Sequence, residues 1–391
     1  MLGRFPKARL FVVDDETIYV AKNGTASIKV PSLITENKDK KNEKKISKKW
    51  RGTVVDIAAD LLQLELGDYI FLWQVKGDNH PSQIFGVYRT ISMPYFKMEN
   101  ANDEFPFKVG IELAYDFKNP VDEYDVLNSP LAKGAMTVWT IWGKKIAQKS
   151  RGAVPLTFEG IQYLITLLMW KNNGSFRYQP WDNNRIVSIE NPLRIDAYKK
   201  DDRSKQLVIK PKESLWSQIN PNDLGWRDSQ GRLTYEKVWE ALFNQKIVQR
   251  DSEFLDQFGI HTNKIVWFAN YLPYSLEKKE MDYLIMESED GFNISRYLVV
   301  EFKCGRIDKD HIERSFLYCN WLDDTYGFGN SVVEPILIYE DPLNMENPSS
   351  DEQGCIELIK SLEKKHRKKL SLFSCKIQSS HISINPMIIP A

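Results

Sequence analysis

The sequence lacks several features that would assign it to a common class of protein. Only four of its 391 residues are cysteines, and no two of them have CxxC spacing or lie near a cluster of histidines. A disulfide framework and a structural zinc site are therefore disfavoured. The five histidines are scattered and form neither a recognisable triad nor an HExxH pattern. We expect four reduced and mostly buried thiols, which belong to Cys304, Cys319, Cys355 and Cys375.

Long hydrophobic runs and an excess of one charge are also missing. No segment approaches the roughly 20 consecutive apolar residues that a membrane helix requires. The apolar run near the N-terminus is short, and no small-residue cleavage site follows it. We therefore expect a soluble cytoplasmic protein with no membrane partner. Lys plus Arg and Asp plus Glu both number 53, so net charge gives no information about a nucleic-acid partner.

Positive charge is nevertheless concentrated in two short segments. Seven lysines lie between Lys38 and Lys49, and five basic residues lie between Lys364 and Lys369. Such clusters neutralise phosphates, but a solvated loop and a solvated helix face explain them equally well. Residues 36–49 are too polar to bury, and we interpret them as a mobile loop.

Residue patterns in the first part of the chain predict a mixed domain over residues 1–170. Alternation in 8–32 predicts short strands, 53–68 predicts a helix, and YIFLWQV followed by QIFGVYRTI predicts a hairpin. FKVGIELAYDF predicts a further strand, and Thr157 is placed to cap an apolar helix that extends to Trp170. Residues 171–230 are rich in Asn, Asp, Pro and Lys, and we interpret them as a connector with a small hairpin.

A second periodic region begins near residue 232. It predicts a helix, three strands, another helix and a fourth strand by residue 341. The first helix is indicated by apolar side chains at i, i+3, i+4, i+7 and i+8, namely Tyr235, Val238, Trp239, Leu242 and Phe243. The second is indicated by Ile312, Phe316, Cys319 and Leu322.

The strongest catalytic pattern lies between residues 280 and 305. Asp282 opens one predicted strand, a polar turn follows, and Glu301-Phe302-Lys303 closes the next strand. Alternate residues of a strand share a face, so Glu301 and Lys303 point to one side while Phe302 turns into the core. A hairpin brings Asp282 beside them. Two carboxylates at one point form an oxygen-ligand site suited to Mg²⁺.

This arrangement resembles the common core of PD-(D/E)XK nucleases, in which an acid and a short hairpin precede Glu-x-Lys at the end of an apolar strand. The 19-residue spacing from Asp282 to Glu301 and the strand VVEFK fit the pattern, whereas Met281 replaces its proline. The resemblance implies an α/β restriction-endonuclease-like domain with a mixed central sheet over residues 231–391. It also implies Mg²⁺ as the cofactor, with Mn²⁺ as a substitute.

The same resemblance implies roles for single residues. Asp282, Glu301 and the main-chain carbonyl of Phe302 would bind the metal, and Lys303 would position the nucleophile and stabilise the developing oxyanion. An acid on the preceding helix would complete the site, either Glu236, which we favour, or Glu240. Arg314 stands where related nucleases often have glutamine and could instead reach phosphate. The alternative for the whole pattern is a surface ion pair at a strand end.

Residues 1–170 resemble the PUA-like superfamily that includes EVE and YTH domains. The segment from KKWRGTVVD to GDYIFLWQV, then QIFGVYRTI and a strand followed by Pro120-Val121, carries this resemblance. It implies an α+β barrel with an aromatic pocket for one flipped base. Trp50 best matches the cage tryptophan, and weaker candidates are Trp73, Tyr88 and Tyr95. Gly110 replaces a second cage tryptophan of some relatives, which leaves the recognised modification open.

Together the two patterns favour a modification-dependent restriction endonuclease that acts on double-stranded DNA. Cutting both strands would require a homodimer, because one site handles one strand. A DNA-repair or structure-specific nuclease with the same catalytic core is one alternative. A non-enzymatic nucleic-acid binding protein, in which the acidic cluster is structural, is another.

Overall fold

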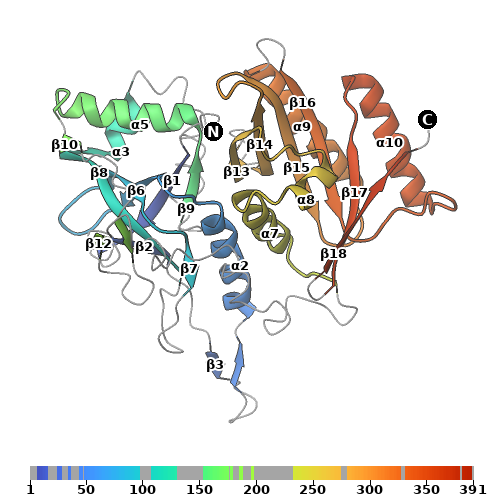
Figure 1. The fold of residues 1–391 in the computed structure, drawn as a ribbon, viewed down its shortest axis with the longest axis horizontal. Helices are drawn as coiled ribbons and strands as arrows, with labels where there is room; N and C mark the ends of the chain where they lie inside the picture. The colour runs from blue at the N-terminus through green and yellow to red at the C-terminus, as the bar shows by residue number, and fades with distance from the viewer. Residues whose placement is uncertain are drawn as a thin grey trace. The chain divides into compact units, whose positions relative to one another are not determined.

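The computed structural model divides into two compact units, Pro6–Leu224 and Gly225–Ala391 together with Met1–Phe5 (Figure 1). The boundary falls within the predicted connector 171–230, most of which belongs to the first unit. The residues that the structure describes are 7–15, 24–28, 34–36, 44–46, 48–96, 107–129, 153–175, 177–178, 185–187, 195–197, 232–273, 280–326, 331–378 and 381–389.

The first unit is built around a mixed sheet with the strand order β10-β8-β6-β5-β1-β9, and β2 and β7 also pair with β8. Strands β1 and β5 are parallel, and the other pairs are antiparallel. The predicted hairpin is confirmed as β5–β6. The strands are β1 (Ala8–Val13), β2 (Thr25–Ile28), β5 (Tyr69–Gln74), β6 (Gln83–Thr90), β7 (Tyr95–Phe96), β8 (Phe107–Asp122), β9 (Ala153–Leu156) and β10 (Arg177–Tyr178).

Among the described residues of this unit, the helices beside the sheet are α2 (Lys48–Leu62), α3 (Glu123–Asn128) and α5 (Phe158–Lys171). The predicted cap is confirmed, because the Thr157 hydroxyl accepts a hydrogen bond from Gly160 N at 3.3 Å. Apolar residues of α5, including Ile161, Leu164 and Leu168, pack on β1, β5 and β6 in one buried core. This unit is therefore an α+β domain.

Two short hairpins complete the described part of the first unit. Strands β11 (Arg185–Val187) and β12 (Ile195–Ala197) form a small antiparallel pair within the region interpreted as a connector. Strands β3 (Ile34–Glu36) and β4 (Lys44–Ile46) form another. The interpretation of 36–49 as a mobile loop is therefore corrected at Glu36, at 44–46 and at Lys48, where α2 begins. Strand pairing satisfies the backbone polar groups even in this charged segment.

The second unit contains a six-stranded sheet in the order β13-β14-β15-β16-β17-β18. Strands β15, β16 and β17 are parallel and β13, β14 and β18 are antiparallel to their neighbours, so the predicted mixed sheet is present. The strands are β13 (Ile265–Pro273), β14 (Glu280–Ser288), β15 (Ile294–Lys303), β16 (Val332–Tyr339), β17 (Ser371–Gln378) and β18 (His381–Met387).

Helices cover both faces of this sheet. Helix α9 connects β15 to β16 and α10 connects β16 to β17, as parallel neighbours require. Their apolar side chains bury one face, whereas Phe243 of α7 meets Phe302 on the other at a ring distance of 5.0 Å. The helices are α7 (Lys237–Val248), α8 (Ser252–Leu255), the 3₁₀ helix η5 (Asp256–Phe258), α9 (Lys309–Tyr326) and α10 (Ser350–His366).

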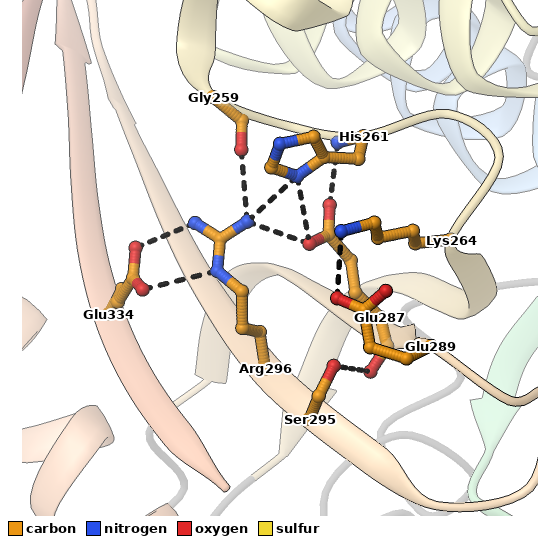
Figure 2. Close-up of polar contacts among 8 residues, drawn as sticks. All are labelled: Gly259, His261, Lys264, Glu287, Glu289, Ser295, Arg296 and Glu334. Atoms are coloured by element: carbon orange, nitrogen blue, oxygen red, sulfur yellow. Dashed lines mark hydrogen bonds and ion pairs between the residues drawn. The ribbon is translucent and has the colours of Figure 1, made fainter.

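A polar network ties three strands of this sheet together (Figure 2). Arg296 of β15 donates to Glu287 of β14 at 2.7 Å and forms two bonds to Glu334 of β16 at 3.1 and 2.7 Å. Glu287 is fully buried and also accepts a hydrogen bond from His261 N at 2.6 Å. The Arg296 guanidinium and the His261 main-chain N–H thus compensate the buried charge of Glu287.

The four cysteines are free, as expected, with Cys319, Cys355 and Cys375 buried and Cys304 partly buried. Burial raises the pKa of each thiol, so none is prepared as a thiolate nucleophile. Among the described helices, none is long and apolar enough to cross a membrane.

Candidate functional site

Asp282 and Glu301 meet where the β14–β15 ladder ends. The paired register extends to Tyr283 and Val300, and the next residue on each strand is one of the two acids. Asp282 N donates to Glu301 Oε1 at 3.3 Å, and Phe302 N donates to Asp282 Oδ2 at 3.1 Å. Each carboxylate thus accepts a hydrogen bond from the main chain of the other strand, which fixes the two strand ends side by side. The structure brings these two predicted site residues together as the hairpin geometry requires.

Both carboxyl groups are in surroundings that disfavour their charged form. Glu301 is fully buried, and Asp282 is half-buried. Burial, and then the charge of Asp282, raise the pKa of Glu301 well above its usual value, against the attraction of Arg314. Burial also raises the pKa of Asp282, although the Lys237 ammonium and the Phe302 N–H oppose the rise. A cation at this position would remove the conflict between the two charges.

One oxygen of the pair has no hydrogen-bond donor. Glu301 Oε2 is buried and accepts no hydrogen bond from any described residue, and Arg314 Nη2 lies 4.0 Å away. Buried carboxylate oxygens normally accept hydrogen bonds, so one that accepts none is a candidate for binding a ligand. The donor set, two carboxylates at one point, suits a hard divalent cation.

Glu236 and Glu240, the two candidate acids near the start of α7, lie in different environments. Lys303 Nζ lies 3.4 Å from Glu236 Oε1, and both side chains are partly exposed. Glu240 is instead buried, and both of its oxygens are engaged, Oε1 by Lys237 and Oε2 by Asn270 Nδ2 at 3.0 Å. Glu236 therefore stays the better candidate for completing the site.

Phe302 lies in the core, as expected. Its ring is fully buried against Phe243 and Tyr283, and this fixes the main chain between Glu301 and Lys303. Across the described residues, no group of three or more His, Cys, Asp and Glu side chains could hold a metal ion.

Two cations on the helices near the acids are Arg314, which from its place in the sequence could reach phosphate, and Lys237, for which the sequence predicts no role. Lys237 begins α7 and is buried, and Arg314 projects from α9 toward Glu301. The sequence carries one weak signal that Lys237 has a charged partner. Its position one turn before Glu240 is the only sequence signal, because residues at i and i+3 of a helix are neighbours.

The aromatic candidates of the first unit lie mostly in its core. Trp73 and Tyr95 are fully buried and Tyr88 is 7% exposed, so the first two rings present no exposed face. Burial raises the pKa of Tyr88 to about 12. Trp50 lies in the first turn of α2 instead of before the helix, and its side chain lies outside the described residues. The side chains of Tyr124 and Trp170, in contrast, are 70% and 67% exposed.

Comparison with known proteins gives only distant structural similarity. No family model matches the chain, and no curated protein matches it. The chain is similar to a hypothetical protein from Leishmania major at 10% identity, with a TM-score of 0.28, over 42% of this chain and 96% of that one. Two further structures to which the chain is similar are complexes with modified nucleic acid.

One is human THYN1 in complex with 5-methylcytosine-containing DNA, at 11% identity and a TM-score of 0.24, over 41% of this chain and 96% of that one. The other is the YTH domain of Zygosaccharomyces rouxii MRB1 in complex with N6-methyladenosine RNA. It has 12% identity and a TM-score of 0.24, over 42% of this chain and 88% of that one.

Proposed function

We propose that this chain is a metal-dependent endodeoxyribonuclease whose reaction takes place at Asp282 and Glu301. The observation that carries the proposal is the buried Glu301 Oε2, which has no hydrogen-bond donor among the described residues and lies beside a second carboxylate at a strand end. Lys303 follows Glu301 on β15, whereas Asp282 lies on the neighbouring strand β14, so the order along the chain is acid, acid, lysine. This combination is poorly explained by a surface ion pair, because Glu301 is fully buried.

Asp282, Glu301 and the Phe302 carbonyl are the groups that would hold Mg²⁺ or Mn²⁺. When bound, the metal would lower the pKa of a water ligand and offset charge on the scissile phosphate. Lys303 would orient the attacking water and stabilise negative charge on the phosphoryl oxygens. Glu236, 3.4 Å from Lys303, would hold its ammonium in position.

The finer part of the proposal is that cleavage depends on a modified base. Its support is the PUA-like pattern of the first unit, in which Trp50 matches the cage tryptophan. A base captured by this unit would direct the nuclease to DNA carrying that base, and a homodimer would cut both strands. The buried Trp73 and Tyr95 would then support the pocket from the core.

The test is Mg²⁺-dependent cleavage of plasmid DNA from modified and unmodified sources by the wild type and by Lys303→Ala. We expect the substitution to reduce the rate by about 100-fold or more, because the lost charge acts mainly in the transition state. The matched control is Lys264→Ala, which removes a partly exposed lysine beside the other end of β14. It should cleave like the wild type.

Each result has a distinct meaning. Cleavage of modified DNA only, abolished in Lys303→Ala, supports both parts of the proposal. Cleavage of all DNA retains the nuclease and removes the dependence on modification. An equal rate for wild type and Lys303→Ala refutes the assignment of the site.

A further inference from the structure

Glu340 is a buried acid at the same edge of the sheet as Lys303. Strands β15 and β16 run parallel, and the last pair in their register joins Lys303 to Tyr339. Glu340 directly follows Tyr339, so it leaves β16 where Lys303 ends β15. It is 3% exposed. A buried carboxylate is costly unless donors compensate it, so the contacts of Glu340 show what keeps it in this place.

The Glu340 side chain holds the segment that leads into α7. Leu233 N donates to Glu340 Oε1 at 3.2 Å, although the two residues are 107 positions apart in the chain. Leu233 is itself buried. Glu236 follows shortly after it as the residue that precedes α7, and its carbonyl accepts a hydrogen bond from Trp239 N at 2.9 Å. The Glu340 carboxylate therefore fixes the chain just before Glu236.

The main chain of Glu340 holds the bend that follows Lys303. Glu340 N and Asp341 N both donate to the Gly305 carbonyl, at 3.2 and 3.1 Å. Gly305 has a φ of 83°, in the left-handed region that glycine adopts without strain. Asp341 Oδ2 also lies 3.5 Å from Arg232 Nη1, at the start of the segment that leads into α7. The ends of β15 and β16 and the start of α7 are thus tied together.

These contacts form a closed circuit around Glu236 and Lys303. Lys303 Nζ lies 3.4 Å from Glu236 Oε1, and the two side chains are 25% and 39% exposed. The circuit runs from Lys303 to Gly305, across to Glu340, through its carboxylate to Leu233, and back to Glu236. An exposed ion pair contributes little by itself. The distance between Glu236 and Lys303 therefore depends on the buried anchor behind them.

We propose that Glu340 is a positioning residue, which fixes the start of α7 against the end of β15 so that Glu236 stays within ion-pair reach of Lys303. This inference rests on the proposed function, in which Lys303 orients the attacking water. Its physical basis is that a hydrogen bond from the main chain to a buried carboxylate fixes the backbone. Removing the acceptor leaves the Leu233 N–H buried and unpaired, which favours a shift of this segment.

The first measurement is hydrogen exchange of the full-length protein, followed by mass spectrometry. In Glu340→Met the amides of residues 232–239 should exchange about tenfold faster than in the wild type, because the Leu233 N–H loses its acceptor. Glu340→Gln keeps an oxygen that can accept this hydrogen bond and should exchange like the wild type.

Glu352→Met is the matched control. Glu352 is another buried glutamate of this unit that accepts main-chain hydrogen bonds, from Asn344 N at 3.2 Å and from Ser349 N at 2.8 Å. Its removal should leave the exchange of residues 232–239 unchanged.

The second measurement is the kinetics of DNA cleavage. Glu340→Met should lower kcat about tenfold and change KM little, because a misplaced Lys303 affects the transition state more than it affects DNA binding. Glu340→Gln should recover most of this loss. In a Glu236→Ala background, Glu340→Met should change kcat by less than about twofold, because the pair that it positions is already lost.

Glu340→Asp guards against misfolding of Glu340→Met. It keeps the buried charge but shortens the reach to Leu233 N, so exchange and kcat should change in the same directions as in Glu340→Met. Circular dichroism confirms that each variant is folded.

The outcomes separate this inference from the proposed function. If exchange of residues 232–239 is unchanged in Glu340→Met and Glu340→Asp, the anchor does not hold this segment and the inference is wrong, whether or not the protein cleaves DNA. If the losses of kcat in Glu340→Met and Glu236→Ala multiply, the inference is likewise wrong and the nuclease proposal stands. If the wild type cleaves no DNA, the proposed function fails and the positioning role fails with it.

Discussion

At the scale of single residues, Glu301 is a carboxylate in a place that disfavours its charge. Its pKa is raised by burial and by Asp282, so the folded protein favours the protonated form. The stability that this gives is present at low pH and is lost as the pH rises through the folded-state pKa. Without metal, the site therefore opposes folding at neutral and higher pH. Such opposition is common where a residue is kept for function.

Glu301→Gln tests this conflict. The amide keeps an acceptor for Asp282 N and removes the buried charge, so the metal-free variant should be about 1 kcal/mol more stable than the wild type at pH 8. The gain should shrink as the pH falls, while cleavage is lost at every pH. Urea denaturation in the presence of a chelator at pH 5 and pH 8 provides the measurement.

Asp290→Asn is a control for which the expected change in stability at pH 8 has the opposite sign. The Asp290 carboxylate accepts hydrogen bonds from Asn293 N and Phe292 N, both at 2.8 Å, which lower its pKa. Its contribution to stability is present above the unfolded-state pKa and is lost as the pH falls. Asp290→Asn should therefore destabilise at pH 8 and less so at low pH. A loss of stability in Glu301→Gln at pH 8 would contradict our account of the site.

At the scale of secondary-structure elements, Arg296 joins three strands of the second unit. It connects β15 to the buried Glu287 of β14 and to Glu334 of β16, and its Nη1 also donates to the carbonyl of Gly259 at 3.0 Å (Figure 2). β14 and β15 are the strands that present Asp282 and Glu301. The network thus anchors both strands near the ends away from the site.

Arg296→Met should destabilise the protein by about 3 kcal/mol, because Glu287 would lose its cation while fully buried. The control Lys264→Met removes a lysine paired at 2.7 Å with Glu289, whose side chain is 64% exposed. Exposed pairs contribute little, so this change should stay within about 0.5 kcal/mol. Chemical denaturation compares the two, and equal losses would refute the role of the Arg296 network.

At the scale of the whole molecule, the two units have separate cores. The core of the first unit is formed by residues between Ala8 and Leu168, and those of the second by residues between Trp267 and Leu372. Each of these three clusters of described residues draws its side chains from a single unit. We therefore expect DNA preference and metal binding to respond independently to substitutions.

Trp50→Ala tests this independence. It should abolish the preference for modified DNA, because the proposed stacking partner of the base is lost, while Mn²⁺ binding at Asp282 and Glu301 stays unchanged. Trp170→Ala is the matched control, since it removes an exposed tryptophan of the same unit. Cleavage assays on modified and unmodified plasmids distinguish them. An unchanged preference in Trp50→Ala would refute its role as the cage tryptophan.

The sequence alone predicted the order of the main elements between residues 232 and 341, although not the short α8 and η5 there, and it gave no prediction for α10, β17 and β18. Apolar periodicity is a local property, so the helix face around Trp239, the β14–β15 hairpin and the cap at Thr157 could be read directly. The proximity of Asp282 and Glu301 was also predictable, because two consecutive strands joined by a short turn pair as a hairpin. Strand alternation placed Phe302 in the core.

Tertiary structure decided the rest. Whether an aromatic ring is a pocket wall or part of the core depends on packing between distant segments, and Trp73 and Tyr95 proved to be buried. The same holds for Glu240, which is engaged by Lys237 and by Asn270 of another element. Such contacts leave no periodic signal in the sequence. Local pattern therefore determined which residues could form the site, and packing decided which of them are available to a ligand.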